Sequence, residues 1–254
     1  MKSRVRLAGV AVLLSFACAS AAFAQQADST SAAKAVVRSG ARPGRGSVGA
    51  QIGGAWIVSE KDYSQGAQPR LSISGQYGYV IGDHWRWQVS PYFAWNAYGV
   101  GNRIPFRDEN FPADTTKDQI LTQVAGANAQ LQYQKLRGGW LWHFGVGPSL
   151  LRVVVQNHRK VLKDPVTKDL HQGQYLGAVA ELGAEHFFKE LDNTSLEYTV
   201  GYQTVFAKRN DQFPSGFNGS LSFLEVRVGA HYYFDFKKAK KPDDKPGAKP
   251  KMKK

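Results

Sequence analysis

The sequence predicts an all-β protein, an eight-stranded antiparallel up-and-down transmembrane β-barrel. Three observations predict it. Apolar residues alternate with small or polar ones from Ser47 to Phe236, the connections between these stretches are alternately long and short, and the charge of this region is balanced. Alternation with a period of two gives a strand one apolar and one polar face. An apolar exterior around a polar interior is the arrangement of a barrel that crosses a membrane.

The net charge of +13 lies outside this alternating region. Residues 1–46 carry +6 and residues 237–254 carry +7, whereas residues 47–236 contain 17 basic and 17 acidic side chains. A folded nucleic-acid-binding domain carries its basic excess on the fold itself. We therefore expect that nucleic acid is not a partner.

The N-terminus is typical of an export signal. A basic segment precedes an apolar run, and Ala22-Phe23-Ala24 provides the small residues that a signal peptidase reads. We predict a cleaved signal peptide at 1–24; a buried N-terminal helix and lipoprotein processing at Cys18 are the alternatives. Cleavage leaves a mature protein without cysteine, and therefore without a disulfide or a thiolate metal site.

Two segments beside the alternating region have no period. Residues 25–46, rich in Ser, Ala, Gly and Arg, predict a flexible periplasmic linker. Lys237–Lys254 contains nine lysines and predicts a disordered periplasmic tail. This tail is either a solvated spacer or a polycation that binds peptidoglycan or anionic lipid through a salt-sensitive attraction. The predicted outer-membrane β-barrel between them covers 47–236.

Eight stretches of alternation make up this domain. Each is long enough to cross a bilayer, since about 9–11 tilted residues suffice. The segment 119–134 is ambiguous because its alanines also suit a helix, and 151–155 is ambiguous because it is apolar throughout. In chain order, the apolar faces run from Val48 to Val58, Leu71 to Tyr79, Trp85 to Trp95, Ala125 to Tyr133, Trp140 to Leu150, Leu176 to Ala184, Leu196 to Phe206 and Leu224 to Phe236.

The connections alternate in length. Short periplasmic turns and long external loops are typical of an outer-membrane barrel, whereas a soluble sandwich has no reason to alternate in this way. The long connections are 60–69, 101–118, 157–171 and 208–216, and the short ones are 82–84, 135–139 and 189–193.

Aromatic residues gather where the strands meet the short turns. Amphipathic rings are most stable at a membrane interface, so we predict a girdle there. The alternative is the aromatic core of a two-sheet sandwich. The predicted girdle comprises Trp85, Trp87, Trp140, Trp142, Tyr232, Phe234 and Phe236.

Over 47–236 the chain resembles the small eight-stranded outer-membrane barrels, such as the OmpA transmembrane domain and OmpX. The most specific similarity is the alternation from Val228 to Phe236, which looks like the terminal signature that the barrel-assembly machinery reads. The resemblance implies outer-membrane lipid and that machinery as partners. In those proteins the final Phe usually ends the chain, whereas 18 residues follow it here.

The inward faces carry charged residues, which predicts a polar network inside the barrel. Eight strands enclose a lumen that is filled by side chains or holds one small ligand. Charges at membrane depth need partners, so we expect linked ion pairs or a partly protonated carboxylate. Glu185 and Glu197 are expected to face each other, where like charges repel. The predicted network comprises Arg86, His143, Glu181, Glu185, Glu197, Glu225, Arg227 and His231.

No motif indicates catalysis. The histidines have no HExxH or other metal spacing, and the His-x-Ser of lipid A deacylase barrels is missing. We expect no enzyme activity, no metal site and no cofactor. The predicted function is that of a monomeric outer-membrane protein for envelope integrity or surface interaction and adhesion. The alternatives are an OmpW-like barrel that transports a hydrophobic or small solute, a narrow ion path, and a soluble lipocalin-like binder.

Overall fold

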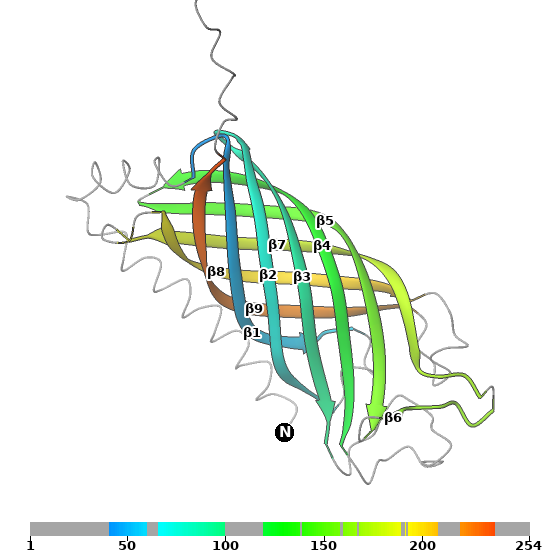
Figure 1. The fold of residues 1–254 in the computed structure, drawn as a ribbon. Helices are drawn as coiled ribbons and strands as arrows, with labels where there is room; N and C mark the ends of the chain where they lie inside the picture. Colours follow the sequence, from blue (N-terminus) through cyan, green and yellow to red (C-terminus); the bar gives the residue numbers. More distant parts are fainter. Residues whose placement is uncertain are drawn as a thin grey trace, which may run out of the picture.

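A computed structural model describes residues 41–59, 66–99, 119–137, 139–157, 160–166, 168–188, 191, 193–207 and 219–236. Within these residues, nine antiparallel strands form one sheet that closes on itself (Figure 1). In the described part of the chain, no helix is long and apolar enough to span a membrane. The strands are β1 (Arg45–Ile57), β2 (Ala67–Gly82), β3 (Trp85–Tyr98), β4 (Ile120–Arg137), β5 (Trp140–Asn157), β6 (Lys160–Val161), β7 (Gln172–Phe187), β8 (Thr194–Ala207) and β9 (Gly219–Asp235).

Eight of these strands form the barrel wall, because the two-residue β6 pairs only with the end of β5. The order around the wall is β4-β3-β2-β1-β9-β8-β7-β5, and pairing of β5 with β4 closes it. The first and last long strands meet at the β1–β9 seam, from the pair Arg45–Asp235 to the pair Ile57–Phe223. The predicted eight-stranded antiparallel up-and-down barrel is therefore confirmed.

The barrel has a turn end with short connections and a loop end with long connections. The turn end contains the connections β2–β3, β4–β5 and β7–β8, together with the start of β1 and the end of β9. The loop end contains the connections β1–β2, β3–β4, β5–β7 and β8–β9. The alternation of short and long connections predicted from the sequence follows these two ends.

Both ambiguous segments are strands. β4 covers nearly all of 119–134 and pairs with β3 and β5 on its two sides, so a helix is excluded there. β5 continues through 151–155 to Asn157. The predicted long connection 157–171 does join two wall strands, and it also contains β6 and a bridge between Lys163 and Leu170. Backbone pairing with the end of β5 orders this segment as a small hairpin.

Side chains alternate between the lumen and the outer surface along every long strand. The outward positions are apolar and exposed, as at Ile52, Leu176 and Leu182. The inward positions are buried, and many of them are polar. A wall of this kind buries its polar groups among themselves and presents hydrocarbon to lipid.

The lumen has two halves of opposite character. Near the turn end it is filled by charged and amide side chains, but near the loop end an apolar cluster shares it with neutral polar side chains such as Asn96, Thr122 and Gln203. The predicted polar lumen therefore extends into the loop half only in part. The reason is that inward positions there, such as Leu151 on β5 and Phe223 on β9, are apolar. The loop-end cluster comprises Ala55, Ile57, Tyr92, Ala94, Tyr98, Ile120, Val124, Leu151, Val153, Val155, Leu162, Tyr175, Val205, Leu221 and Phe223.

The barrel starts at Arg45, two residues before the predicted boundary at 47, and β9 ends at Asp235. The predicted signal peptide at 1–24 and the tail at 237–254 lie outside the described residues, as does most of the predicted linker. The last residues of that linker, from Ala41, are described, and they lie against the turn end of the barrel.

Candidate functional site

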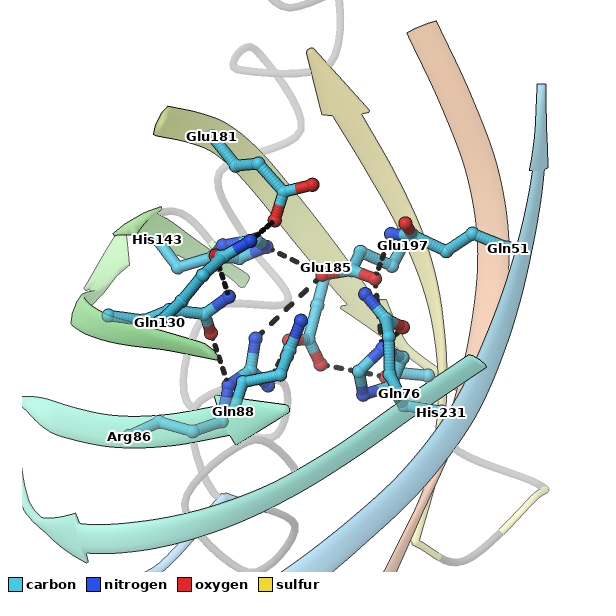
Figure 2. A network of polar contacts seen from close by, with 12 residues as sticks. Gln51, Gln76, Arg86, Gln88, Gln130, His143, Glu181, Glu185, Glu197 and His231 are labelled. Atoms are coloured by element: carbon cyan, nitrogen blue, oxygen red, sulfur yellow. Dashed lines mark hydrogen bonds and ion pairs between the residues drawn. The ribbon is translucent and has the colours of Figure 1, made fainter. Parts of the chain in front are cut away.

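All eight charged residues predicted for the lumen are buried, in the turn half and the middle of the barrel, each no more than 3 % exposed. They project inward from β3, β5, β7, β8 and β9, so the closed wall brings together residues that are up to 145 positions apart in the chain. Figure 2 shows most of them in one polar cluster. The cluster consists of two groups, one around Arg86 and one around Arg227.

The first group centres on Arg86 and Glu185. Arg86 Nη1 lies 2.6 Å from Glu185 Oε1, and Arg86 Nε donates a hydrogen bond of 2.6 Å to Gln132 Oε1. The other carboxylate oxygen of Glu185 accepts hydrogen bonds from the Tyr233 hydroxyl at 2.6 Å and from Ser195 Oγ at 2.9 Å. Both oxygens of this buried carboxylate are therefore satisfied, as burial of a charge requires.

Glu197 lies beside this pair and contacts two histidines. His143 Nε2 is 2.8 Å from Glu197 Oε1, and His231 Nε2 is 2.9 Å from Glu197 Oε2. Gln51 Nε2 donates to Glu197 Oε2, and Arg86 Nη2 is 3.7 Å from Glu197 Oε1 (Figure 2). The ligand atoms of His143, Glu185 and Glu197 all lie within 4.8 Å of one another.

The second group lies nearer the loop end and centres on Arg227. This guanidinium contacts Glu181, and its Nη1 atom is 3.1 Å from Glu225 Oε2. Gln130 Nε2 donates a hydrogen bond of 2.6 Å to Glu181, and the Tyr92 hydroxyl donates to Glu225. Tyr92 also belongs to the loop-end apolar cluster, so this hydrogen bond marks the boundary between the two halves of the lumen.

The charged residues were predicted individually, but their neutral partners were not. Glutamines, tyrosines and a serine donate or accept most of the hydrogen bonds around the carboxylates. The sequence could have indicated these neutral partners, because each of them occupies an inward position of the alternation. The partners missed are Gln51, Gln76, Tyr92, Gln130, Gln132, Ser195 and Tyr233.

The turn end of the lumen is closed by apolar side chains and by the segment before β1. Val80, Leu141, Phe187 and Tyr233 form a buried cluster, against which Ala41 packs. Arg42 and Arg45 both form ion pairs with Asp235 at the end of β9, with N–O distances of 2.9 and 3.2 Å. Arg45 Nη2 also donates to the backbone oxygen of Tyr233 at 3.0 Å.

The aromatic residues predicted as a girdle lie on the outer face near the turn end. Trp85, Trp87 and Tyr232 are well exposed, whereas Trp140 is partly covered by His186 and Tyr198. Several rings contact one another in edge or tilted geometry, which is the favoured arrangement for aromatic pairs. These contacts are Trp85–Tyr133, Tyr77–Trp87, Tyr79–Phe236 and Phe234–Phe236.

The closed wall, the apolar outer surface and the aromatic belt define the class of the protein, a small eight-stranded β-barrel of the outer-membrane type. No known family and no curated protein matches the chain. Similar solved structures include those of three outer-membrane barrels.

The first is Ail, the attachment invasion locus protein of Yersinia pestis, in complex with the heparin analogue sucrose octasulfate. Ail is 13 % identical in sequence over 76 % of this chain and 99 % of that chain, with a TM-score of 0.44. The outer membrane protein OprG from Pseudomonas aeruginosa is 12 % identical over 78 % of this chain and 99 % of that chain, with a TM-score of 0.45. Neisserial surface protein A is 14 % identical over 74 % of this chain and 97 % of that chain, with a TM-score of 0.43.

Proposed function

We propose that the protein is a non-catalytic barrel of the bacterial outer membrane that contributes to envelope integrity or to surface interaction and adhesion. The observation that carries this proposal is the filled lumen. Side chains occupy it from the turn-end cluster through the ion-pair network to the loop-end apolar cluster. A barrel filled in this way acts through its surfaces and its ends rather than as a channel.

The loop-end apolar cluster is the main barrier to ions. An ion that left the polar half would have to pass Leu151, Val153 and Phe223, whose apolar side chains do not replace its hydration shell. The polar half is itself closed, because its carboxylates are bound by arginine, histidine and hydrogen-bond donors. A narrow ion path is therefore the less favoured function.

Conductance across planar bilayers tests the closed lumen. We expect no stepwise openings from the purified mature protein, and the same silent traces from the variants Glu181→Gln and Arg227→Gln. Folding of each sample is checked by heat-modifiable mobility on a gel. Regular single-channel steps from the folded wild-type protein would overturn the proposal, and loss of those steps in either variant would assign them to the lumen.

Cell fractionation tests the location. The exported protein is expected with the outer membrane, released by detergent and not by osmotic shock. Release by osmotic shock alone would instead support the soluble binder. The segment Val228–Phe236 is proposed as the recognition signal for the barrel-assembly machinery, and replacement of Phe236 by Ala should reduce the amount of assembled barrel.

The tail Lys237–Lys254 is proposed to bind the anionic cell wall or anionic lipid head groups. Sedimentation with purified peptidoglycan compares the mature protein with a variant that ends at Phe236. We expect binding that falls as salt is raised, and that is lost with the tail. Equal sedimentation of the two proteins would assign the binding elsewhere or exclude it.

The apolar loop half favours a second candidate, an OmpW-like barrel that passes a hydrophobic solute. Uptake of a radiolabelled long-chain alkane into vesicles that contain the protein measures this activity. Uptake faster than in protein-free vesicles, and changed by Phe223→Ala, would favour transport over the first proposal.

A further inference from the structure

We propose that the turn half of the lumen binds one transition-metal ion, with zinc as the reference ion, through His143, Glu185 and Glu197. His231 contacts the second oxygen of Glu197 and positions this ligand. The site goes beyond the proposed surface role, since it concerns how the barrel is held together. It was not visible in the sequence, because each ligand comes from a different strand.

The positions of the ligand atoms suit a small ion. One ligand atom from each of the three side chains lies within 4.8 Å of the others, and His143 Nε2 is 2.8 Å from Glu197 Oε1. Zinc bonds of about 2.0–2.1 Å in a tetrahedral site place ligand atoms about 3.3 Å apart. The pair of His143 and Glu197 therefore needs to open by about 0.5 Å, whereas a Glu185 oxygen at the 4.8 Å limit needs to approach by about 1.5 Å.

Buried atoms without a hydrogen bond also lie at the proposed metal site. Among the described residues, His143 Nε2 and Glu197 Oε1 have no hydrogen bond, although both are buried. A buried polar atom without a hydrogen bond destabilises the fold, because it loses its contacts with water. Here a nitrogen and an oxygen that are both good zinc ligands face each other at ion-pair distance with poor hydrogen-bond geometry.

The charge of the network also favours a divalent cation. The two arginines, Arg86 and Arg227, face four carboxylates in the turn half. With neutral imidazoles, the form in which histidine binds metals, the eight charged and histidine side chains therefore carry a formal charge of −2. One divalent ion brings this charge to zero. Burial of an uncompensated charge is costly, so the ion contributes to the stability of the fold.

The chemistry of the ligands selects the metal. Imidazole nitrogen together with carboxylate oxygen suits zinc, cobalt, nickel and copper, whereas magnesium and calcium prefer oxygen ligands alone. Arg86 Nη1 pairs with Glu185 Oε1 and its Nε atom with Gln132, so the ion would bind Glu185 beside this contact, through a remaining lone pair of the carboxylate. The Arg86 Nη2 atom stays 3.7 Å from Glu197.

The ion would link neighbouring strands from the inside. His143 lies on β5, Glu185 on β7, Glu197 on β8 and His231 on β9, and these four strands are consecutive in the barrel wall. The side chains at the turn end bury the site, so the ion enters while the barrel folds and exchanges slowly afterwards. The expected consequence is a higher urea midpoint for barrel refolded with zinc than for barrel refolded with a chelator.

Zinc retention by the mature protein tests the proposal. The protein is refolded in detergent with a small excess of zinc, treated with EDTA, passed through a gel-filtration column and assayed for metal. We expect one zinc per folded barrel, resistant to EDTA until the barrel is unfolded. No retained zinc, or zinc removed by EDTA from the folded protein, would show an adventitious ion only and overturn the proposal.

Variants locate the ion. His143→Gln removes a ligand, whereas His186→Gln changes an outward histidine of β7 that lies against Trp140. Retention is expected to be lost in the first variant and kept in the second. Equal retention by both would place the zinc elsewhere and overturn the site.

Refolding with cobalt gives a readout that does not depend on any variant. Four-coordinate cobalt in a nitrogen and oxygen site has intense visible absorption bands, whereas hydrated cobalt has only weak ones. We expect intense bands from the folded wild-type protein that disappear on unfolding. The spectrum of hydrated cobalt from folded protein would count against the site even if His143→Gln failed to fold.

Discussion

Glu185 and Glu197 lie directly opposite each other on β7 and β8, and both side chains are fully buried. Two carboxylates in this position repel each other. Arg86 resolves the repulsion from across the lumen, because its guanidinium is 2.6 Å from Glu185 and 3.7 Å from Glu197. One arginine on β3 therefore allows two adjacent strands to carry glutamate at the same level.

Replacement of Arg86 should destabilise the barrel strongly. Arg86→Met leaves two buried carboxylates without their cation, and loss of one partner from a buried ion pair costs about 3–5 kcal/mol. Urea unfolding in detergent or lipid vesicles measures the loss. The control is Arg152→Met on the outer face, where the exposed Arg152 donates a hydrogen bond to Gln172; about 0.5 kcal/mol or less is expected.

A double variant separates charge from packing. If repulsion causes the loss, Arg86→Met with Glu185→Gln should be more stable than Arg86→Met alone. A double variant that is no more stable than the single one would show that the packing of Arg86, and not its charge, matters.

Gly183 should not tolerate a side chain. A Cβ atom at this position would meet the ring of His143 from the neighbouring strand. Gly183→Ala is therefore expected to displace the imidazole and lower the free energy of unfolding by about 1–3 kcal/mol, as overpacking does. Gly82→Ala is the control, because a Cβ atom there would have no heavy atom within 4 Å. Similar urea midpoints for the two variants would contradict the position of His143.

The lipid-facing surface gives a prediction that depends on depth. Leu182 is 54 % exposed on the outer face in the middle of β7, and Leu191 is 56 % exposed in the turn that follows this strand. Leu182→Arg should cost about 2–4 kcal/mol in phospholipid vesicles, whereas Leu191→Arg should cost about 0–1 kcal/mol. Equal costs would mean that the bilayer does not cover the middle of β7.

The strands and their faces could be predicted from the sequence because alternation is a local property. Alternation also predicted that Glu185 faces Glu197, since the short connection between their strands fixes the register of the hairpin. Two features could not be predicted in this way. The apolar part of the loop half arises where Leu151 and Phe223 break the alternation, and the contact of His143 with Glu197, two strands apart, depends on the curvature of the wall. Periodicity assigns a face, whereas the curvature and closure of the wall decide which inward side chains meet.

The ion pairs at the β1–β9 seam should differ in strength. Arg42 and Arg45 both contact Asp235, but Arg42 is exposed and Arg45 is buried. Arg42→Ala should change the free energy of unfolding by about 0–1 kcal/mol, as is usual for exposed pairs. Arg45→Ala also removes a buried hydrogen bond to Tyr233 and should cost about 1–3 kcal/mol. If Arg42→Ala lowered the free energy of unfolding more than Arg45→Ala, the segment before β1 would stabilise the barrel more than the buried contacts of Arg45 do.

The last prediction concerns the boundary between the polar and apolar halves of the lumen. Tyr92 packs in the loop-end apolar cluster, and its hydroxyl donates to Glu225 in the network. Tyr92→Phe keeps the packing and removes only the donor, so the buried carboxylate should lose about 1–3 kcal/mol of stabilisation. Tyr77→Phe is the matched control, because Tyr77 is exposed on the outer face against Trp87. The double variant Tyr92→Phe with Glu225→Gln should recover part of the loss, since the amide carries no charge. If Tyr92→Phe is as stable as Tyr77→Phe, the hydrogen bond from Tyr92 does not stabilise the boundary between the two halves. The Arg227 guanidinium would then be sufficient to stabilise the buried Glu225 carboxylate.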